Sequence, residues 1–312
     1  MASMPTFGFI VGSPRSGTTW LQLLLLQDPR VVSVQETHVF SEWIAPLVKA
    51  TRSDRARGRV VGLSALFDDD QILEMGRSLF QPIVDRALQE RPDAAVFVEK
   101  TPAHVRQAET IVELYPDARF IELVRDPRAV AASLIAASRT WGRSWAPSDA
   151  AGSARRWRNA VRAGDQLRDL TPHVVRVRYE DLTSDGPATL LGVMELLGLP
   201  ADLDHCRRLF ELCAVERLGD GRVEKPLGMS GNVAGTARNA SAAGWRDELD
   251  RANIRTIEAI CGDEMAALGY DLAGGDGKVP PLPLVTGSAK AAVRRALDGV
   301  ATASTAAARK VR

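Results

Sequence analysis

The fold is decided by the stretch Gly12-Ser13-Pro14-Arg15-Ser16-Gly17-Thr18-Thr19. It lies between an apolar run at residues 7–11 and an apolar pattern of helical period at residues 18–27, so it should join a buried strand to a helix. A glycine-rich connection at this place has the spacing of a Walker A loop, in which backbone N–H groups at a helix N-terminus bind phosphate oxygens. The sequence therefore predicts a phosphate-binding loop after the first strand of an α/β protein.

One departure from the Walker pattern narrows the kind of ligand. The lysine expected directly after Gly17 is replaced by Thr18, and the cation of the loop, Arg15, comes earlier. In nucleoside triphosphatases that lysine contacts the β and γ phosphates. A kinase also needs an aspartate after a strand to hold Mg²⁺, and none is evident. The loop favours a ligand without a γ-phosphate, with a P-loop kinase and a non-catalytic nucleotide-binding module as the alternatives.

Short apolar runs alternate with longer helical patterns, which is typical of βαβ units around a parallel sheet. Strands are expected at residues 7–11, 31–34, 95–98, 119–124 and 174–177, and helices at 18–27, 103–114, 127–137, 187–197, 203–215 and 247–268. Residues 41–91 and 139–158 are interpreted as insertions, and residues 219–244 as a long functional loop. We predict an α/β domain at residues 1–273, with a P-loop-like parallel sheet flanked by helices, followed by a proline-containing linker and basic tail at 274–312.

The composition is that of an ordinary globular protein, with 312 residues, 45% of them hydrophobic and 25% charged. The formal net charge of +1 provides no overall field for a nucleic acid, and none is expected as a partner. The three cysteines have no metal-binding spacing, and their odd number and wide separation favour reduced thiols. Because no signal peptide or long apolar run is evident, we expect a cytoplasmic protein. Because no Cys/His metal spacing is evident, we expect no metal.

Two segments together resemble a known family. Residues 14–19 resemble the 5′-phosphosulfate loop of sulfotransferases, especially those of the tyrosylprotein, carbohydrate and bacterial branches. Residues 121–133 resemble the family segment in which a strand-end arginine and a serine eight residues later bind the 3′-phosphate of the donor. The resemblance covers roughly the first 200 residues. It implies the sulfotransferase fold and the donor 3′-phosphoadenosine-5′-phosphosulfate (PAPS).

The resemblance also implies which residues hold the donor. The 5′-phosphosulfate would contact consecutive residues of the loop: Arg15, Ser16, Gly17, Thr18 and Thr19. Arg125 and Ser133 would bind the 3′-phosphate, and the physics agrees, because Arg125 follows a strand at the edge where open α/β sheets bind ligands. Tyr179 would lie near the adenosine, with ordinary core packing as the alternative. Arg238 begins a segment similar to the late Gly-Trp loop of the family, although the basic pair usual before that glycine is absent.

Sulfuryl transfer by in-line displacement needs a base for the acceptor and cations for the sulfuryl oxygens and the leaving phosphate. Glu36, at the end of the second predicted strand, is the candidate base, since its Glu-Thr setting resembles that of the catalytic glutamate in the tyrosylprotein branch. A simple ion pair with Arg15 is the alternative for Glu36. Lys100, after the third predicted strand, resembles the catalytic lysine of the family. Arg15 would share the sulfuryl charge.

The acceptor side is defined by fewer signals. His104 is the rival base, but it lies four residues after the lysine with a proline between, whereas the small-molecule cytosolic branch has an interval of two. His38 is a second candidate facing the acceptor. Trp141, with Trp145 and Trp157, would wall an apolar or aromatic acceptor, against the alternative of ordinary core packing.

The predicted function is therefore sulfuryl transfer from PAPS to a hydroxyl or amine of an acceptor, expected to be a small molecule, lipid or glycoside. The tail from residue 278 has seven Lys or Arg against one Asp, a balance of +6. A basic helix on an anionic membrane is one interpretation of this tail, and a solvated tail is favoured because its apolar face is poor. The sequence leaves the oligomeric state open.

Overall fold

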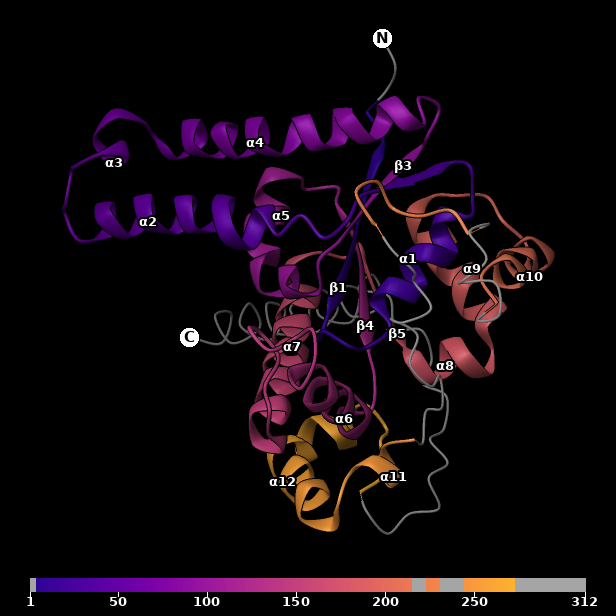
Figure 1. Cartoon of the computed structure of the whole chain (residues 1–312). Helices are drawn as coiled ribbons and strands as arrows, with labels where there is room; N and C mark the ends of the chain where they lie inside the picture. Colours follow the sequence, from indigo (N-terminus) through magenta and orange to yellow (C-terminus); the bar gives the residue numbers. More distant parts are fainter. Residues whose placement is uncertain (1–3, 215–222, 231–243, 273–312) are drawn as a thin grey trace, which may run out of the picture.

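The computed structural model describes residues 4–214, 223–230 and 244–272, and contains a five-stranded sheet (Figure 1). Its strands are β1 (Thr6–Gly12), β2 (Val31–Ser33), β3 (Val96–Lys100), β4 (Arg119–Val124) and β5 (Val174–Arg178). All pairs are parallel, in the order β2-β3-β1-β4-β5. The predicted parallel sheet flanked by helices is confirmed, and each predicted strand overlaps an observed one.

The central strands are buried on both faces, which explains why they form nearly continuous apolar runs. Along β1, Ile10 packs into one hydrophobic core, while Phe9 and Val11 pack into another on the opposite face. β3 continues beyond its predicted apolar run through Glu99 and Lys100, both buried, and Lys100 is in register with Ile10. The longer strand brings these two charged side chains to the carboxyl edge of the sheet.

Helices cover both faces of the sheet. One core lies under α1 (Thr18–Leu26), α8 (Tyr179–Ser184), α9 (Gly186–Leu197) and α10 (Leu203–Leu212). The opposite core lies under the π-helix η1 (Phe40–Ile44), α2 (Ala45–Ala56), α4 (Asp69–Glu90), the 3-10 helix η2 (Pro102–Gln107), α5 (Ala108–Leu114) and α7 (Ala150–Leu170). A third core joins α7 to α6 (Pro127–Ser138), α11 (Trp245–Glu248) and α12 (Arg251–Ala267).

The residues 41–91 interpreted as an insertion form a helical hairpin. α2 and α4 project together from the body, and the short helix α3 (Leu63–Leu66) lies at their turn (Figure 1). α4 begins with a capping box, in which Asp68 accepts from the Gln71 backbone N–H and the Gln71 side chain accepts from the Asp68 N–H. Phe80 and Val84, which are fully buried in the second core, anchor α4 to the body.

The helix α7 corrects the interpretation of residues 139–158 as an insertion. Its five arginines obscure an apolar stripe, yet Trp157, Val161 and Leu167 are buried. The Asp149 side chain accepts from the Gly152 backbone N–H and caps the helix start. The stripe packs against the sheet and α12, so tertiary contacts outweigh the polar appearance of the segment.

The three cysteines are buried and form no disulfide, as expected. Cys206 and Cys213 belong to the first core, and Cys261 belongs to the third. Burial raises the pKa of the Cys213 thiol to about 12, and burial with the nearby charge of Glu264 does the same for Cys261.

Three of the sequence predictions fall wholly or partly outside the described residues, namely the basic tail at 274–312, Arg238, and the long loop at 219–244, of which only 223–230 and 244 are described. Within residues 4–214, 223–230 and 244–272, no helix combines the length and the apolar character needed to cross a membrane.

Candidate active site

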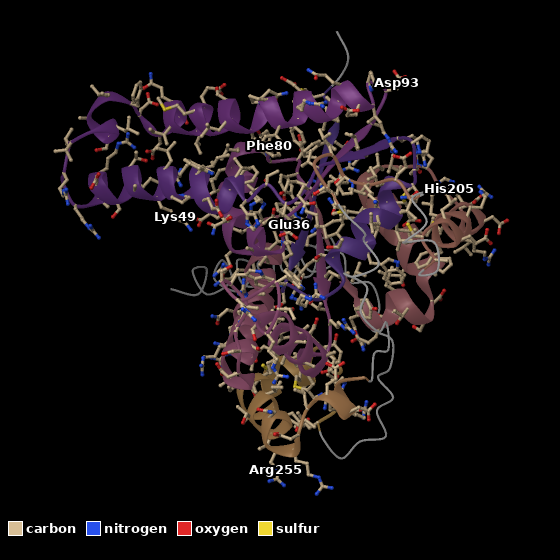
Figure 2. The ribbon with its side chains drawn as sticks, viewed as in Figure 1. Glu36, Lys49, Phe80, Asp93, His205 and Arg255 are labelled. Carbon is tan, nitrogen blue, oxygen red and sulfur yellow. The ribbon has the colours of Figure 1, made fainter. Side chains whose placement is uncertain are left out.

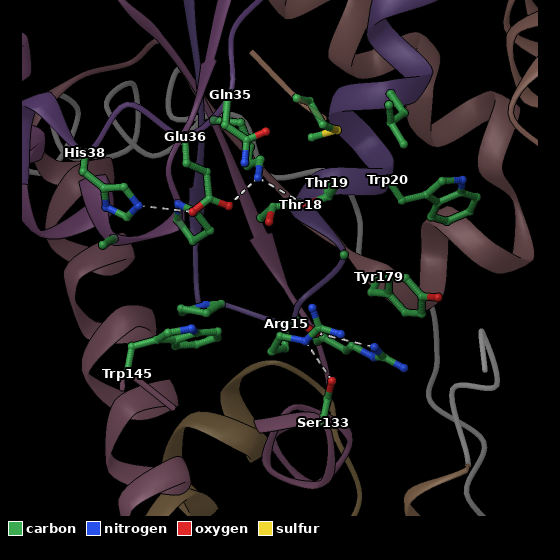
Figure 3. A pocket seen from close by; sticks show the side chains of 18 of the residues that line it. Arg15, Thr18, Thr19, Trp20, Gln35, Glu36, His38, Ser133, Trp145 and Tyr179 are labelled. Atoms are coloured by element: carbon green, nitrogen blue, oxygen red, sulfur yellow. Dashed lines mark hydrogen bonds and ion pairs between the residues drawn. The ribbon is translucent and has the colours of Figure 1, made fainter. Parts of the chain in front are cut away.

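A cavity of about 420 Å³ lies at the carboxyl ends of β1, β3 and β4. Figure 3 shows His38, Glu36 and Trp145 on one side of the view, Trp20 and Tyr179 on the other, and Arg15 between them. The sheet thereby brings together most residues predicted for the site: Arg15, Gly17, Thr18, Thr19, Glu36, His38, Lys100, Arg125, Ser133, Trp141 and Tyr179.

The loop after β1 exposes backbone to this cavity. Gly17 has a φ of 97° and is the N-cap residue of α1, without a side-chain cap, so the first N–H groups of the helix are not satisfied by a capping side chain. A Cβ at Gly17 would lie 2.5 Å from a ring carbon of Tyr179, which restricts the position to glycine. The hydroxyl of Ser16 is buried and has no hydrogen-bond partner among the described residues. These features are those of an anion-binding loop.

Two arginines contribute to the site, Arg15 within the loop and Arg125 directly after β4. Arg15 donates from Nε to Ser133 Oγ at 2.9 Å, and its guanidinium carbon lies 5.4 Å from the ring centroid of Trp141. Its φ of 71° is left-handed, a conformation that non-glycine residues adopt rarely and often at functional sites. The guanidinium carbon of Arg125 lies 4.1 Å from the ring centroid of Tyr179, the first residue of α8. The Nε atom of Arg125 is buried without a hydrogen-bond partner in the described part of the chain.

Glu36 and Lys100 form an ion pair inside the cavity (Figure 3). Lys100 is 1% exposed and also donates to Thr19 Oγ1 at 3.2 Å. The Glu36 side chain is 30% exposed, and its second oxygen lies 3.5 Å from Nε2 of His38. Figure 2 shows Glu36 in the middle of the molecule, between α2, which carries Lys49, and α10, which carries His205. The Glu36 carboxylate is thus held from two sides and still faces the cavity.

The match to a family model decides the class of protein. Residues 8–203, more than half of the chain, match the model of the sulfotransferase family. The chain belongs to the sulfotransferase family. The resemblance inferred from the loop and the strand-end arginine is therefore confirmed, and the protein is a sulfuryl-transferring enzyme.

Known proteins similar to this sulfotransferase support the same conclusion. It is 25% identical over 272 residues to Protein-tyrosine sulfotransferase 1 of Danio rerio, covering 84% of this chain and 72% of that protein. It is 26% identical over 298 residues to Nodulation protein NoeE of Sinorhizobium fredii, covering 87% of this chain and 67% of that protein.

Solved structures share the fold. The sulfotransferase domain from the curacin biosynthetic pathway matches with a TM-score of 0.53 and 17% identity, over 87% of this chain and 100% of that chain. The mouse sulfotransferase SULT7A1, solved in complex with PAP, also matches with a TM-score of 0.53, at 12% identity, over 85% of this chain and 86% of that chain.

The sulfotransferase keeps His104 out of the cavity. His104 follows Thr101 in η2, which turns its ring into the protein interior, where it is fully buried and its Nδ1 pairs with Glu99 Oε2 at 2.9 Å. The other oxygen of Glu99 accepts from the hydroxyls of Thr101 and Thr37 at 2.6 and 2.9 Å. Burial opposes ionisation of Glu99, but His104 and these hydroxyls lower its pKa to about 2. The structure therefore places the expected rival base in a buried network that includes Thr37, the neighbour of Glu36, and not among the residues that line the cavity.

Only two of the three tryptophans that were predicted to wall the acceptor line the cavity. Trp141 and Trp145 line the cavity of the sulfotransferase, whereas Trp157 is fully buried and donates from Nε1 to Arg125 O at 2.9 Å. Trp157 therefore holds the backbone of Arg125, a residue predicted to bind the 3′-phosphate of PAPS. In the part of the chain that the structure describes, no group of three or more His, Cys, Asp or Glu could hold a metal ion.

Sequence reasoning missed several residues that line the cavity: Trp20, Gln35, Arg156 and Met229. Trp20 follows the two threonines of the loop, and Gln35 precedes Glu36, so their neighbours in the sequence were a usable signal. Arg156 lies on the helix that was not predicted, and Met229 lies in the predicted long loop, beside the residues that pair with the end of β2. Their placement depends on long-range contacts.

Proposed function

We propose that this sulfotransferase moves a sulfuryl group from PAPS to a hydroxyl or amine of a small-molecule, lipid or glycoside acceptor. The observation that carries the proposal is the arrangement of Glu36 and Lys100, which are ion-paired in the same cavity as the phosphate-type loop. A carboxylate with access to the cavity provides a base. A buried ammonium beside the loop provides a charge for the leaving group.

The residues around the loop fit an anionic nucleotide. Ser16 Oγ and Arg125 Nε are buried donors without partners among the described residues, and buried donors are rarely left unsatisfied. We assign the 5′-phosphosulfate to the loop residues 15–19, and the 3′-phosphate to Arg125 and Ser133. Tyr179, against which Arg125 stacks, would lie near the adenosine. Arg238 is assigned to the 3′-phosphate side by family resemblance alone.

PAPS supplies a sulfuryl group whose bond to the bridging phosphate oxygen breaks as the acceptor oxygen or nitrogen bonds to sulfur. Glu36 would accept the proton that the acceptor loses. Lys100 would donate to the bridging oxygen as its negative charge grows, and Thr19 holds that ammonium beside the loop. Arg15, fixed by Ser133, would share the charge of the sulfuryl oxygens.

Nucleotide selectivity in thermal unfolding tests the donor. Adenosine 3′,5′-bisphosphate should raise the Tm, and both 5′-AMP and ATP with Mg²⁺ should raise it far less, because only the first carries a 3′-phosphate. Arg125→Ala should cost about 2–4 kcal/mol of affinity for the bisphosphate. The matched control is Arg139→Ala, at the exposed end of α6 outside the cavity, which should leave this affinity unchanged.

Three outcomes would contradict the proposal. Equal Tm shifts for the bisphosphate and 5′-AMP would remove the 3′-phosphate site. A response to ATP with Mg²⁺ alone would favour the P-loop kinase, and an enzyme that binds the bisphosphate but adds SO₃ to no acceptor would favour the non-catalytic module. Mass spectrometry of acceptor mixtures incubated with PAPS measures that transfer.

A further inference from the structure

One corner of the cavity contains none of the residues assigned above to the donor, the base or the leaving group. Trp141, Trp145 and Arg156 line it, and we call these three residues the Trp–Arg corner. The two indole rings lie 5.3 Å apart between centroids, tilted by 50°. Figure 3 shows Trp145 on the same side of the cavity as Glu36 and His38, opposite Tyr179. The corner therefore belongs to the side where the acceptor would meet the base.

Among the described residues, Arg156 is fixed in this corner by Trp145. Its Nη1 donates to Trp145 O at 2.6 Å, and its guanidinium carbon lies 5.3 Å from the ring centroid of the same residue. A guanidinium has five N–H donors, and contact with a ring face leaves its in-plane donors available. Most of the hydrogen-bonding capacity of Arg156 is thus unused by the described residues.

The charge of Arg156 also lacks a counter-ion within the described part of the chain. In residues 4–214, 223–230 and 244–272, no carboxylate forms a salt bridge or a hydrogen bond with it. Burial lowers the pKa of Arg156, and the charge of Arg106, an exposed residue of η2, lowers it further. A partly buried cation beside a like charge is unfavourable until an anion joins it.

We propose that the Trp–Arg corner binds an anionic group of the acceptor, in the simplest case a carboxylate on a planar aromatic skeleton. The inference rests on the proposed function, because it concerns the acceptor of the same reaction. The guanidinium of Arg156 would bind the carboxylate in its own plane, and the indoles of Trp141 and Trp145 would contact the ring. The acceptor's hydroxyl or amine would then extend toward Glu36.

A matched pair of acceptor analogues tests the charge requirement. 4-Hydroxyphenylacetate and 4-hydroxyphenylacetamide share a ring and a hydroxyl and differ in one negative charge. In calorimetric titration of the enzyme saturated with adenosine 3′,5′-bisphosphate, the carboxylate should bind about tenfold tighter or more, as a charge-assisted hydrogen bond predicts. Arg156→Gln, which keeps a donor for Trp145 O, should abolish the preference. Arg155→Gln, an exposed neighbour outside the cavity, should keep it.

Bisphosphate binding is measured first, so that two failures can be told apart. A wild-type enzyme that does not bind the bisphosphate would refute the proposed function itself. With bisphosphate bound, equal affinity for the two analogues, or binding of neither at millimolar concentration, would refute only the acceptor inference. A preference that survives in Arg156→Gln would assign the anion to Lys100 or Arg15 and would equally overturn it.

Discussion

Replacing Glu99 by glutamine should lower the free energy of unfolding by roughly 3 kcal/mol at neutral pH. Glu99 is fully buried on β3, and burial alone would raise its pKa. The attraction and hydrogen bond of His104, with the hydroxyls of Thr101 and Thr37, instead lower the pKa from 4.5 to about 2. At about 1.4 kcal/mol per pKa unit, this decrease corresponds to the stated contribution of the ionised carboxylate.

The sign of the pH dependence of stability follows from the direction of the pKa shift. Because the folded-state pKa of Glu99 lies below its unfolded-state value of 4.5, the contribution is fully present above that pH and is lost as the pH falls toward 2. Urea unfolding should therefore show a gap between wild type and Glu99→Gln that is largest near neutrality and shrinks in acid. Glu109→Gln, an exposed acid on α5, is the control and should change stability by less than about 0.5 kcal/mol. A gap that is absent, or that stays constant with pH, would refute the ionised Glu99 carboxylate as its source.

The same variant should slow transfer while leaving the Kd of the bisphosphate unchanged. Thr37 donates to Glu99 from both its backbone N and its hydroxyl, and it lies between Glu36 and His38. We therefore expect Glu99 to position the proposed base through Thr37. An unchanged kcat in a folded Glu99→Gln enzyme would show that the network serves stability only.

Two further predictions concern the reacting groups. Glu36→Gln should lower kcat by about 10²–10⁴ with an aliphatic alcohol acceptor while retaining bisphosphate binding, since it removes the proton acceptor but keeps the shape; a loss of less than about tenfold would exclude Glu36 as the base. Lys100→Ala should lower kcat steeply with little change in the Kd of the bisphosphate, because its contact strengthens as charge develops. Normal turnover combined with weak nucleotide binding would make Lys100 a binding residue only.

The strands could be predicted because parallel strands that are buried on both faces form nearly continuous apolar runs. The end of β3 could not, since Glu99 and Lys100 are polar residues whose burial depends on partners distant in the sequence, such as Glu36 and Thr37. Helix α7 could not be predicted for a related reason. Its sequence is rich in arginine, and it is helical because Trp157 and its neighbours pack in the core.

The residues of the candidate site also fall into two groups, those placed by a local motif and those placed by long-range packing. Residues that belong to a compact motif, such as Arg15 and Gly17, could be placed from the sequence, because the loop that joins β1 to α1 fixes them locally. Arg156 could not, since it reaches the cavity only through the packing of α7. The orientation of His104 could not be predicted from its interval after Lys100, because the turn of η2 decides whether the ring faces the cavity or the interior.

The three buried thiols allow local unfolding of the unmodified chain to be measured by their alkylation. Burial raises the pKa of Cys206, Cys213 and Cys261 and keeps alkylating reagents away, so each thiol becomes reactive only when its surroundings separate. Cys206 and Cys213 lie in the core beneath α9 and α10, whereas Cys261 lies where α12 meets α7. Pulse labelling followed by peptide mapping can therefore distinguish the release of one flank of the sheet from the detachment of the C-terminal helix, with no cysteine introduced.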